Sequence, residues 1–189
     1  NGQKVFITGA NEADYMLLLA RTKPFTSVED RRQGLSLFVI DMDSPGLEIQ
    51  PLNIQALAPE KQFQVFFNNV RIPADRLIGE EDLGVRYMFD GMNPERLVVA
   101  AMCQGIGNLA LNRAVEYAKQ REPFGKPIGS YQGLQHPLAH AKAELEAARL
   151  MMYEAAATFD AGKPAGPLSN MAKYLASEAA VSAVDIALQ

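Results

Sequence analysis

Hydrophobic and polar positions follow two different periods along this chain. In the first 80 residues the apolar runs are short, and Phe63, Val65 and Phe67 alternate with Gln62, Gln64, Phe66 and Asn68. A period of two places successive side chains on opposite faces of a strand. We therefore predict strands over 4–8, 15–21, 35–41, 47–51 and 62–70, with an exposed polar loop over 22–33.

From about residue 83 onward the pattern becomes helical. Between Leu134 and Phe159 apolar residues recur at alternating steps of four and three, which predicts a helix that buries one seam. The Gly- and Pro-rich stretch 162–167 ends it, and an alanine-rich helix follows from about 168. With a helix from Pro94 to Gln120, these segments form most of an antiparallel four-helix bundle.

The predicted fold class is therefore α+β. An antiparallel β-barrel or β-sandwich domain covers residues 1–80, and an incomplete helical bundle covers residues 83–189. The first residue is not Met, and the last falls inside a helical pattern, so we expect this chain to be a piece of a longer protein.

The start of the first long helix carries a recognisable signal. Asn93 can cap a helix with its side-chain oxygen, and Pro94 suits the first helical position. Glu95 would then lie in the first turn, where the helix dipole favours an anion.

Composition excludes several classes of function. Hydrophobic residues make up 48% of the 189 residues and charged residues 21%, which is sufficient for a packed core. The net charge of −4 with no basic run argues against nucleic acid as the main partner. No apolar run approaches the roughly 18 residues of a membrane span. Cys103 is the single cysteine, so no disulfide forms within the chain.

Two groups of residues invite a functional interpretation that we do not favour. His136, His140 and Glu144 share one helix face and could hold a metal, but nothing elsewhere completes such a site. Gly105 and Gly107 lie inside a helix rather than after a strand, which favours close helix contact over a phosphate loop.

The loop over 121–127 has two open interpretations. Arg121 follows the end of a helix, where the dipole favours any cation. Alternatively, the loop is a phosphate or diphosphate clamp, with Phe124 as an apolar platform.

Five motifs in order resemble the acyl-CoA dehydrogenase family. They are the strand 1–8 (Asn-Gly-Gln-Lys-Val-Phe-Ile-Thr), the turn 44–46 (Ser-Pro-Gly), the strand end 67–73 (Phe-Asn-Asn-Val-Arg-Ile-Pro), the loop 121–125 (Arg-Glu-Pro-Phe-Gly) and the pair Tyr131-Gln132. The resemblance implies that FAD lies between the β domain and the bundle. Phe6, Ile7 and Thr8 would line the flavin, with the Thr8 hydroxyl near N5 and Phe6 in place of the usual Trp.

In the same family, Arg121, Phe124 and Gln132 would reach the adenosine diphosphate part of an FAD bound mainly to a neighbouring subunit. This implies a homo-oligomer, typically a tetramer. Asn93 and Arg96 would contact the substrate near its thioester.

The resemblance also suggests where the catalytic base lies. One subgroup carries it at the position of Glu95, next to Arg96, and the stretches 170–173 and 175–178 are similar to that subgroup. Many other members use a Glu beyond the end of this chain. A first-turn Glu95 serving only the helix dipole is the structural alternative.

The implied reaction converts an acyl-CoA to the trans-2-enoyl-CoA and passes electrons to an electron-transfer flavoprotein. The alternatives are an acyl-CoA oxidase, a flavin monooxygenase, for which Glu95 would be unexplained, and a non-catalytic helical interaction module. The resemblance implies a cytoplasmic protein if the source is bacterial, and otherwise one of the mitochondrial matrix.

Overall fold

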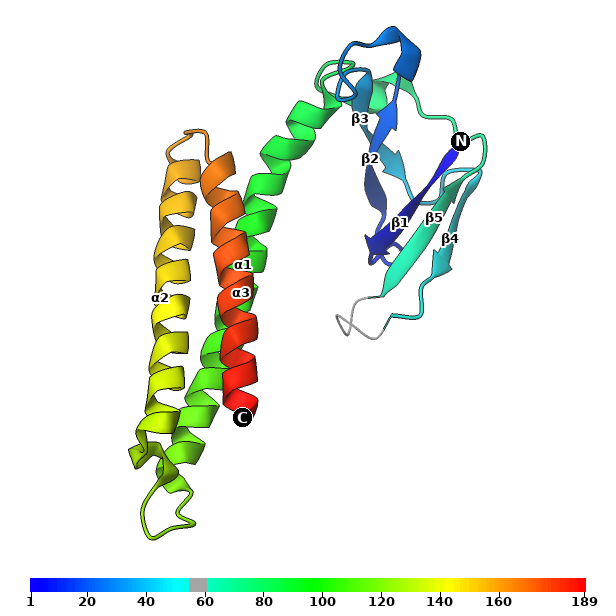
Figure 1. Ribbon diagram of the computed structural model, residues 1–189. Coiled ribbons are helices and arrows are strands. Elements are labelled where there is room, and N and C mark those ends of the chain that lie inside the picture. Colours follow the sequence, from blue (N-terminus) through cyan, green and yellow to red (C-terminus); the bar gives the residue numbers. More distant parts are fainter. Residues whose placement is uncertain (55–60) are drawn as a thin grey trace. The chain divides into compact units, whose positions relative to one another are not determined.

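The computed structural model describes residues 1–54 and 61–189, and these divide into two compact units. Residues 1–88 form the strand-rich unit, and residues 89–189 form the helical unit (Figure 1). We describe each unit by itself. None of the helices in the described ranges has the length and apolar character needed to cross a membrane.

The strand-rich unit contains two small antiparallel sheets. The first has the order β1 (Gly2–Thr8), β5 (Gln62–Phe67), β4 (Leu47–Pro51). The second has the order β2 (Tyr15–Arg21), β3 (Leu35–Asp41), β6 (Leu77–Ile78). Short 3₁₀ turns cover Phe25–Ser27 in the predicted loop and Ala74–Arg76 before β6. The antiparallel pairing confirms the predicted β domain, although the two-residue β6 is too short to show a period in the sequence.

The two sheets bury one core between them. Leu18 and Ile40 from the second sheet pack with Phe63, Val65 and Phe67 from the first. Val65 is fully buried between the half-buried Gln64 and Phe66, which confirms the predicted alternation at these positions. Gln62, predicted on the polar face, is instead buried. The strand ends at Phe67 rather than at residue 70, because Asn69 has a φ of 54° and turns the chain away.

The turn between β3 and β4 requires glycine at position 46. Gly46 has a φ of +87°, and a Cβ there would overlap the carbonyl oxygen of Asn68. We expect Gly46→Ala to lower the free energy of unfolding by about 2–4 kcal/mol, from left-handed strain plus the overlap. Gly9→Ala is the matched control, since Gly9 has a φ of +66° and open space around it. Urea unfolding of both variants tests this, and equal losses would contradict the role of the overlap.

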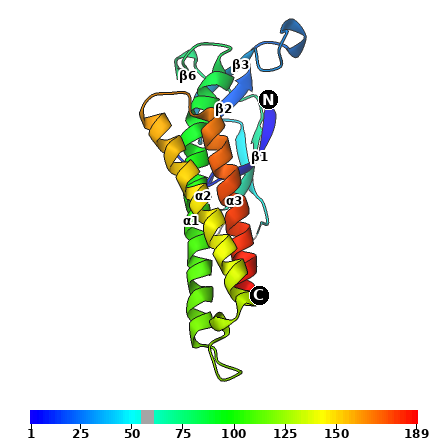
Figure 2. The ribbon, with the colours of Figure 1, turned by 60° about the vertical axis from the view of Figure 1, so that its left-hand side comes forward.

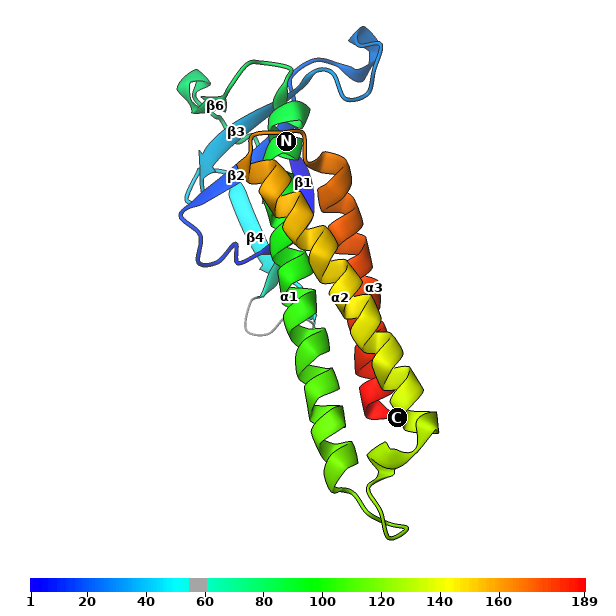
Figure 3. The same ribbon diagram turned by 90° about the vertical axis from the view of Figure 1, so that its left-hand side faces the viewer.

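The helical unit consists of three long helices in the described chain. α1 covers Gly84–Gln120, α2 covers Gln132–Asp160 and α3 covers Gly166–Leu188, with a short 3₁₀ turn at Ile128–Ser130. Figures 2 and 3 agree that α2 and α3 lie side by side along their length. The seam predicted for α2 is confirmed, since Ala141, Leu145 and Ala148 are buried in it. Small residues on the facing helices complete this core: Ala100, Ala176, Ala179 and Ala183.

The predicted start of the first helix is wrong. α1 begins at Gly84, so Pro94 lies inside it and Asn93 does not cap it. Glu95 lies about three turns from the N-terminus, outside the reach of the helix dipole. The cause is a tertiary contact: Gly84 packs so tightly on Ser36 and Leu37 that a Cβ would come within 2.6 Å of their backbone. A helix started there propagates through Pro94 at the loss of one backbone hydrogen bond.

The two glycines that the sequence singled out inside α1, Gly105 and Gly107, behave differently. A Cβ at Gly107 would meet Leu145 at 2.6 Å and the Cα of Ala180 at 3.2 Å, which confirms close helix contact. Gly105 has open space around it, so the same prediction is wrong there.

The two histidines of α2, His136 and His140, are exposed. His140 lies 3.2 Å from Glu144, and the described residues contain no group of three side chains able to hold a metal.

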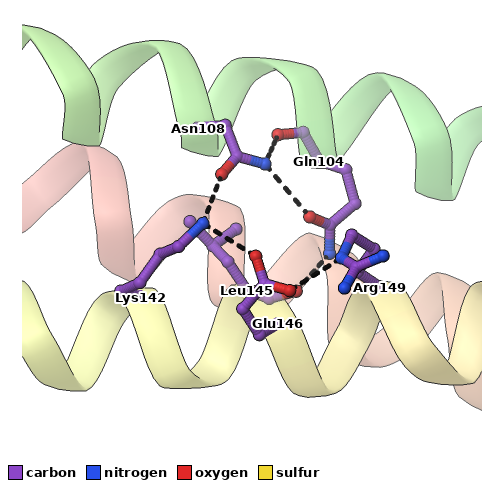
Figure 4. Close-up of polar contacts among 6 residues, drawn as sticks. All are labelled: Gln104, Asn108, Lys142, Leu145, Glu146 and Arg149. Carbon is purple, nitrogen blue, oxygen red and sulfur yellow. Dashed lines mark hydrogen bonds and ion pairs between the residues drawn. The ribbon is translucent and has the colours of Figure 1, made fainter.

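A chain of polar contacts joins α1 to α2 (Figure 4). Gln104, which is buried, donates from Nε2 to the carbonyl oxygen of Leu145 at 2.8 Å. Asn108 donates to the Gln104 side-chain oxygen at 3.3 Å and accepts from Lys142 at 3.4 Å. Lys142 and Arg149 each donate to Glu146 at 2.7 Å. Two of these bonds cross between the helices, from Gln104 to Leu145 and from Lys142 to Asn108. Both require one axial position of α1 against α2, so they specify the register of the two helices.

This chain of contacts predicts a pH effect. Hydrogen bonds from Lys142 and Arg149 lower the pKa of Glu146 below its usual value of 4.5. A lowered pKa contributes stability above pH 4.5 that is lost as pH falls through the lowered value. We therefore expect Glu146→Gln to be less stable than the parent at pH 7, with the gap closing below pH 4. Urea unfolding at both pH values measures the gap, and a gap that is constant with pH would contradict it.

Candidate functional site

β1 contains an irregularity that the sequence did not predict. Lys4 pairs with Val65 and Ile7 pairs with Phe63, so β1 has one residue more than β5 between these pairs. Phe6 lies in this bulge with a φ of 59°, a conformation unusual for a bulky side chain. The bulge shifts the alternation by one residue, so that Ile7 rather than Phe6 packs against the core. Strain of this kind concentrates at functional sites.

The bulge determines what β1 presents at its surface. Phe6 is 65% exposed, an unusual value for a Phe within a strand, and Thr8 is also exposed. β1 is an edge strand of its sheet as far as the structure is described, so one row of its backbone N–H and C=O groups has no partner strand. An apolar ring, a hydroxyl and free backbone groups therefore lie along one short segment.

The Thr8 hydroxyl has a buried partner that sequence reasoning missed. Gln62, which is 7% exposed, lies directly opposite Thr8 in the β1–β5 pair. Its Nε2 donates a hydrogen bond to Thr8 Oγ1 at 2.8 Å. The sequence offered no signal for this contact, because Gln62 and Gln64 both fall on the polar side of the predicted alternation.

α1 carries the three predicted catalytic and substrate-binding residues within a short stretch and brings two of them, Asn93 and Arg96, into contact. Arg96 donates to the side-chain oxygen of Asn93 at 3.2 Å, and its guanidinium carbon lies 5.8 Å from the centre of the Phe89 ring. These contacts hold Arg96 on one side of the helix. Glu95 points elsewhere because consecutive helix residues diverge by about 100°. Glu95 is exposed, and no ion pair or hydrogen bond occupies its carboxylate within the described residues.

The loop between α1 and α2 is highly exposed. The backbone oxygen of Arg121 accepts a hydrogen bond from Ile128 at 2.8 Å, while the side chain of Arg121 extends into solvent. Phe124 is 79% exposed, the next residue Gly125 has a φ of +78°, and Gln132 opens α2. By contrast, Lys119 pairs with Glu116 at 2.7 Å in the last turn of α1, as a cation at a helix end does.

Comparisons with known proteins cover the whole chain. Residues 1–70 match the family described as acyl-CoA dehydrogenase, middle domain, and residues 82–189 match acyl-CoA dehydrogenase, C-terminal domain. Acyl-CoA dehydrogenase FadE12 of Mycobacterium tuberculosis is 45% identical over 100% of this chain and 48% of its own length. This chain therefore spans about half the length of the curated relatives it matches.

Solved structures show the same fold. Butyryl-CoA dehydrogenase from Megasphaera elsdenii has a TM-score of 0.92 at 33% identity, over 100% of this chain and 49% of its own. A structure described as PigA with FAD and proline has a TM-score of 0.93 at 34% identity, with the same coverage of 100% and 49%. Both parts of the sequence match in order, and the fold agrees over the whole length, so the chain belongs to the acyl-CoA dehydrogenase family.

Proposed function

We propose that this chain is part of an FAD-dependent enzyme that dehydrogenates an acyl-CoA thioester to the trans-2-enoyl-CoA. The observation that carries the proposal is the exposed, strained segment of β1 in a chain that matches this family throughout. When bound, FAD supplies the hydride acceptor for the β-carbon of the substrate.

The residues of β1 suit a flavin chemically. The edge of an isoalloxazine ring alternates hydrogen-bond acceptors and a donor, and its faces are apolar. The free backbone groups of β1 offer complementary donors and acceptors, and the Thr8 hydroxyl adds one more. Phe6 and Ile7 would line the ring, with Phe6 screening it from water.

The loop after α1 suits a phosphate-bearing ligand. Arg121 offers a guanidinium with no competing carboxylate bound to it in the described chain, and Phe124 offers an exposed apolar face. We propose that both, with Gln132, bind the adenosine diphosphate part of an FAD held mainly by a neighbouring subunit. The protein would then be a homo-oligomer, and the family pattern suggests a tetramer.

We assign the base to Glu95. Removal of the weakly acidic α-proton needs a carboxylate that is shielded from water, together with hydrogen bonds to the enolate-like carbonyl. Glu95 is exposed in this chain, so its desolvation would accompany acyl-CoA binding. Because Glu95 lies about three turns from the helix N-terminus, a role in balancing the helix dipole does not explain it. Asn93 and Arg96 would contact the substrate near the thioester.

The electron acceptor that we propose is an electron-transfer flavoprotein. The alternative is molecular oxygen, which would make the protein an acyl-CoA oxidase. One similar protein comes from a bacterium, Mycobacterium tuberculosis, and for a bacterial source the location that we propose is the cytoplasm.

An absorbance spectrum of the full protein tests the proposal. It is recorded before and after anaerobic addition of a panel of acyl-CoA thioesters. We expect flavin bands that bleach with at least one thioester. Re-oxidation by an electron-transfer flavoprotein but not by air would support a dehydrogenase, and rapid re-oxidation by air would support an oxidase. A colourless protein would contradict the function and favour a non-catalytic module of the same fold.

A further inference from the structure

The contact between Gln62 and Thr8 has a consequence for hydrogen-bond direction. An amide NH₂ group can only donate, and a hydroxyl can donate one proton and accept at its lone pairs. Because Gln62 Nε2 donates to Thr8 Oγ1 at 2.8 Å, the proton of that hydroxyl cannot be used in the same bond. Within residues 1–54 and 61–189, Thr8 Oγ1 makes no other hydrogen bond. The proton is therefore directed away from Gln62.

The surroundings of this contact keep it in place. Gln62 is one of few buried polar side chains in the described chain, and the strand partner directly opposite it is Thr8. The bulge at Phe6 lies two residues before Thr8. It determines on which face of the sheet the side chains of Ile7 and Thr8 lie. The Gln62 amide is buried and fixed by the strand pair, so it loses little conformational freedom when it donates to the Thr8 hydroxyl. The Thr8 hydroxyl is therefore already oriented before a ligand binds.

We propose that Gln62 is a positioning residue that orients the Thr8 hydroxyl as a hydrogen-bond donor to the bound flavin. This inference rests on the proposed function, in which Thr8 lies near flavin N5. A donor at that position stabilises the negative charge that develops on the ring as it accepts a hydride. Gln62 itself does not touch the flavin and acts only through Thr8.

The test is a double-mutant cycle in the full protein with its flavin bound. The variants are Thr8→Val, Gln62→Leu and the two combined. We expect each single variant to shift the flavin absorbance bands in the same direction and to slow flavin reduction by acyl-CoA about tenfold. In the Thr8→Val background, Gln62→Leu should have no further effect, because the hydroxyl it orients is already gone.

Two further variants make the test sharper. Gln62→Glu keeps the shape but places an acceptor against Thr8, so it should pull the proton away from the flavin and reproduce the Thr8→Val spectrum. Gln64→Leu is the control, since Gln64 lies on the same strand and its amide contacts Gln3 at 3.4 Å instead of Thr8. It should leave the spectrum and the rate at parental values.

The outcomes separate the two proposals. Parental spectra and rates in Gln62→Leu and Gln62→Glu, with flavin bound, would overturn the positioning role alone. An undiminished effect of Gln62→Leu in the Thr8→Val background would also overturn it, because Gln62 would then act through packing. A parent protein that binds no flavin would overturn the proposed function together with this inference.

Discussion

Replacement of Glu95 by Gln should leave the flavin bound and slow dehydrogenation by about 10²- to 10⁴-fold. The amide keeps the size and polarity of the side chain but cannot take the α-proton. Glu95 makes no contact that the structural core depends on, since it is exposed on α1. The loss should therefore appear in the rate of flavin reduction at saturating acyl-CoA, measured by stopped-flow absorbance.

Glu116→Gln is the matched control for this prediction. Glu116 is an exposed acid on the same helix, and its one ion pair, with Lys119, lies at the surface. A surface pair of this kind contributes little to stability, so this variant should keep parental turnover. Near-parental flavin reduction in Glu95→Gln would place the base on a residue outside this chain. A colourless Glu95→Gln protein would instead assign Glu95 to cofactor binding.

The strands and the two later helices could be predicted because their periods agree with their burial. Val65 is fully buried between two exposed or half-buried neighbours, and Leu145 falls in a seam with regular spacing. In both cases the residue that the hydrophobic pattern places on the buried face is also buried in the folded structure. The two-residue β6 offers no such pattern, because pairing with Leu37 and Phe38 alone places it in the sheet.

The start of α1 could not be predicted because its cause is tertiary. Asn93 and Pro94 form a good start signal, and local propensity alone favours a helix from that point. The actual start depends on Gly84, whose missing side chain allows contact with the backbone of Ser36. That contact joins residues 48 positions apart in the chain, and no local pattern contains it.

The sequence proposes residues for the candidate site but does not give their geometry. The motif at 6–8 singles out Phe6 and Thr8, but no feature of the amino-acid sequence indicates that Phe6 takes a left-handed backbone conformation. The extra residue in β1 becomes visible only when its pairing with β5 is known. The same pairing reveals Gln62 as the partner of Thr8, because direct cross-strand neighbours are a property of register.

The largest expected effect on stability comes from Leu145→Ala, which should lower the free energy of unfolding by about 2–5 kcal/mol. Leu145 is fully buried and is the largest such side chain in the helical unit. Its neighbours are already small: the core around it is mostly alanine, and Gly107 lies in direct contact with it. The alanines and the glycine beside Leu145 have no side chain long enough to fill the cavity.

Leu150→Ala is the control that distinguishes the cost of a buried cavity from the cost of removing any leucine side chain. Leu150 lies on the same helix but is 62% exposed, so its truncation should cost less than about 0.5 kcal/mol. Urea unfolding followed by helical circular dichroism measures both variants. Equal small losses for the two variants would contradict the prediction, because the helices would then have moved together to fill the cavity. The hydrogen bond from Gln104 to the Leu145 carbonyl opposes such a movement, since it fixes α1 against α2. A large loss for Leu145→Ala alone would confirm that this one side chain closes an interface built mostly from alanine and glycine.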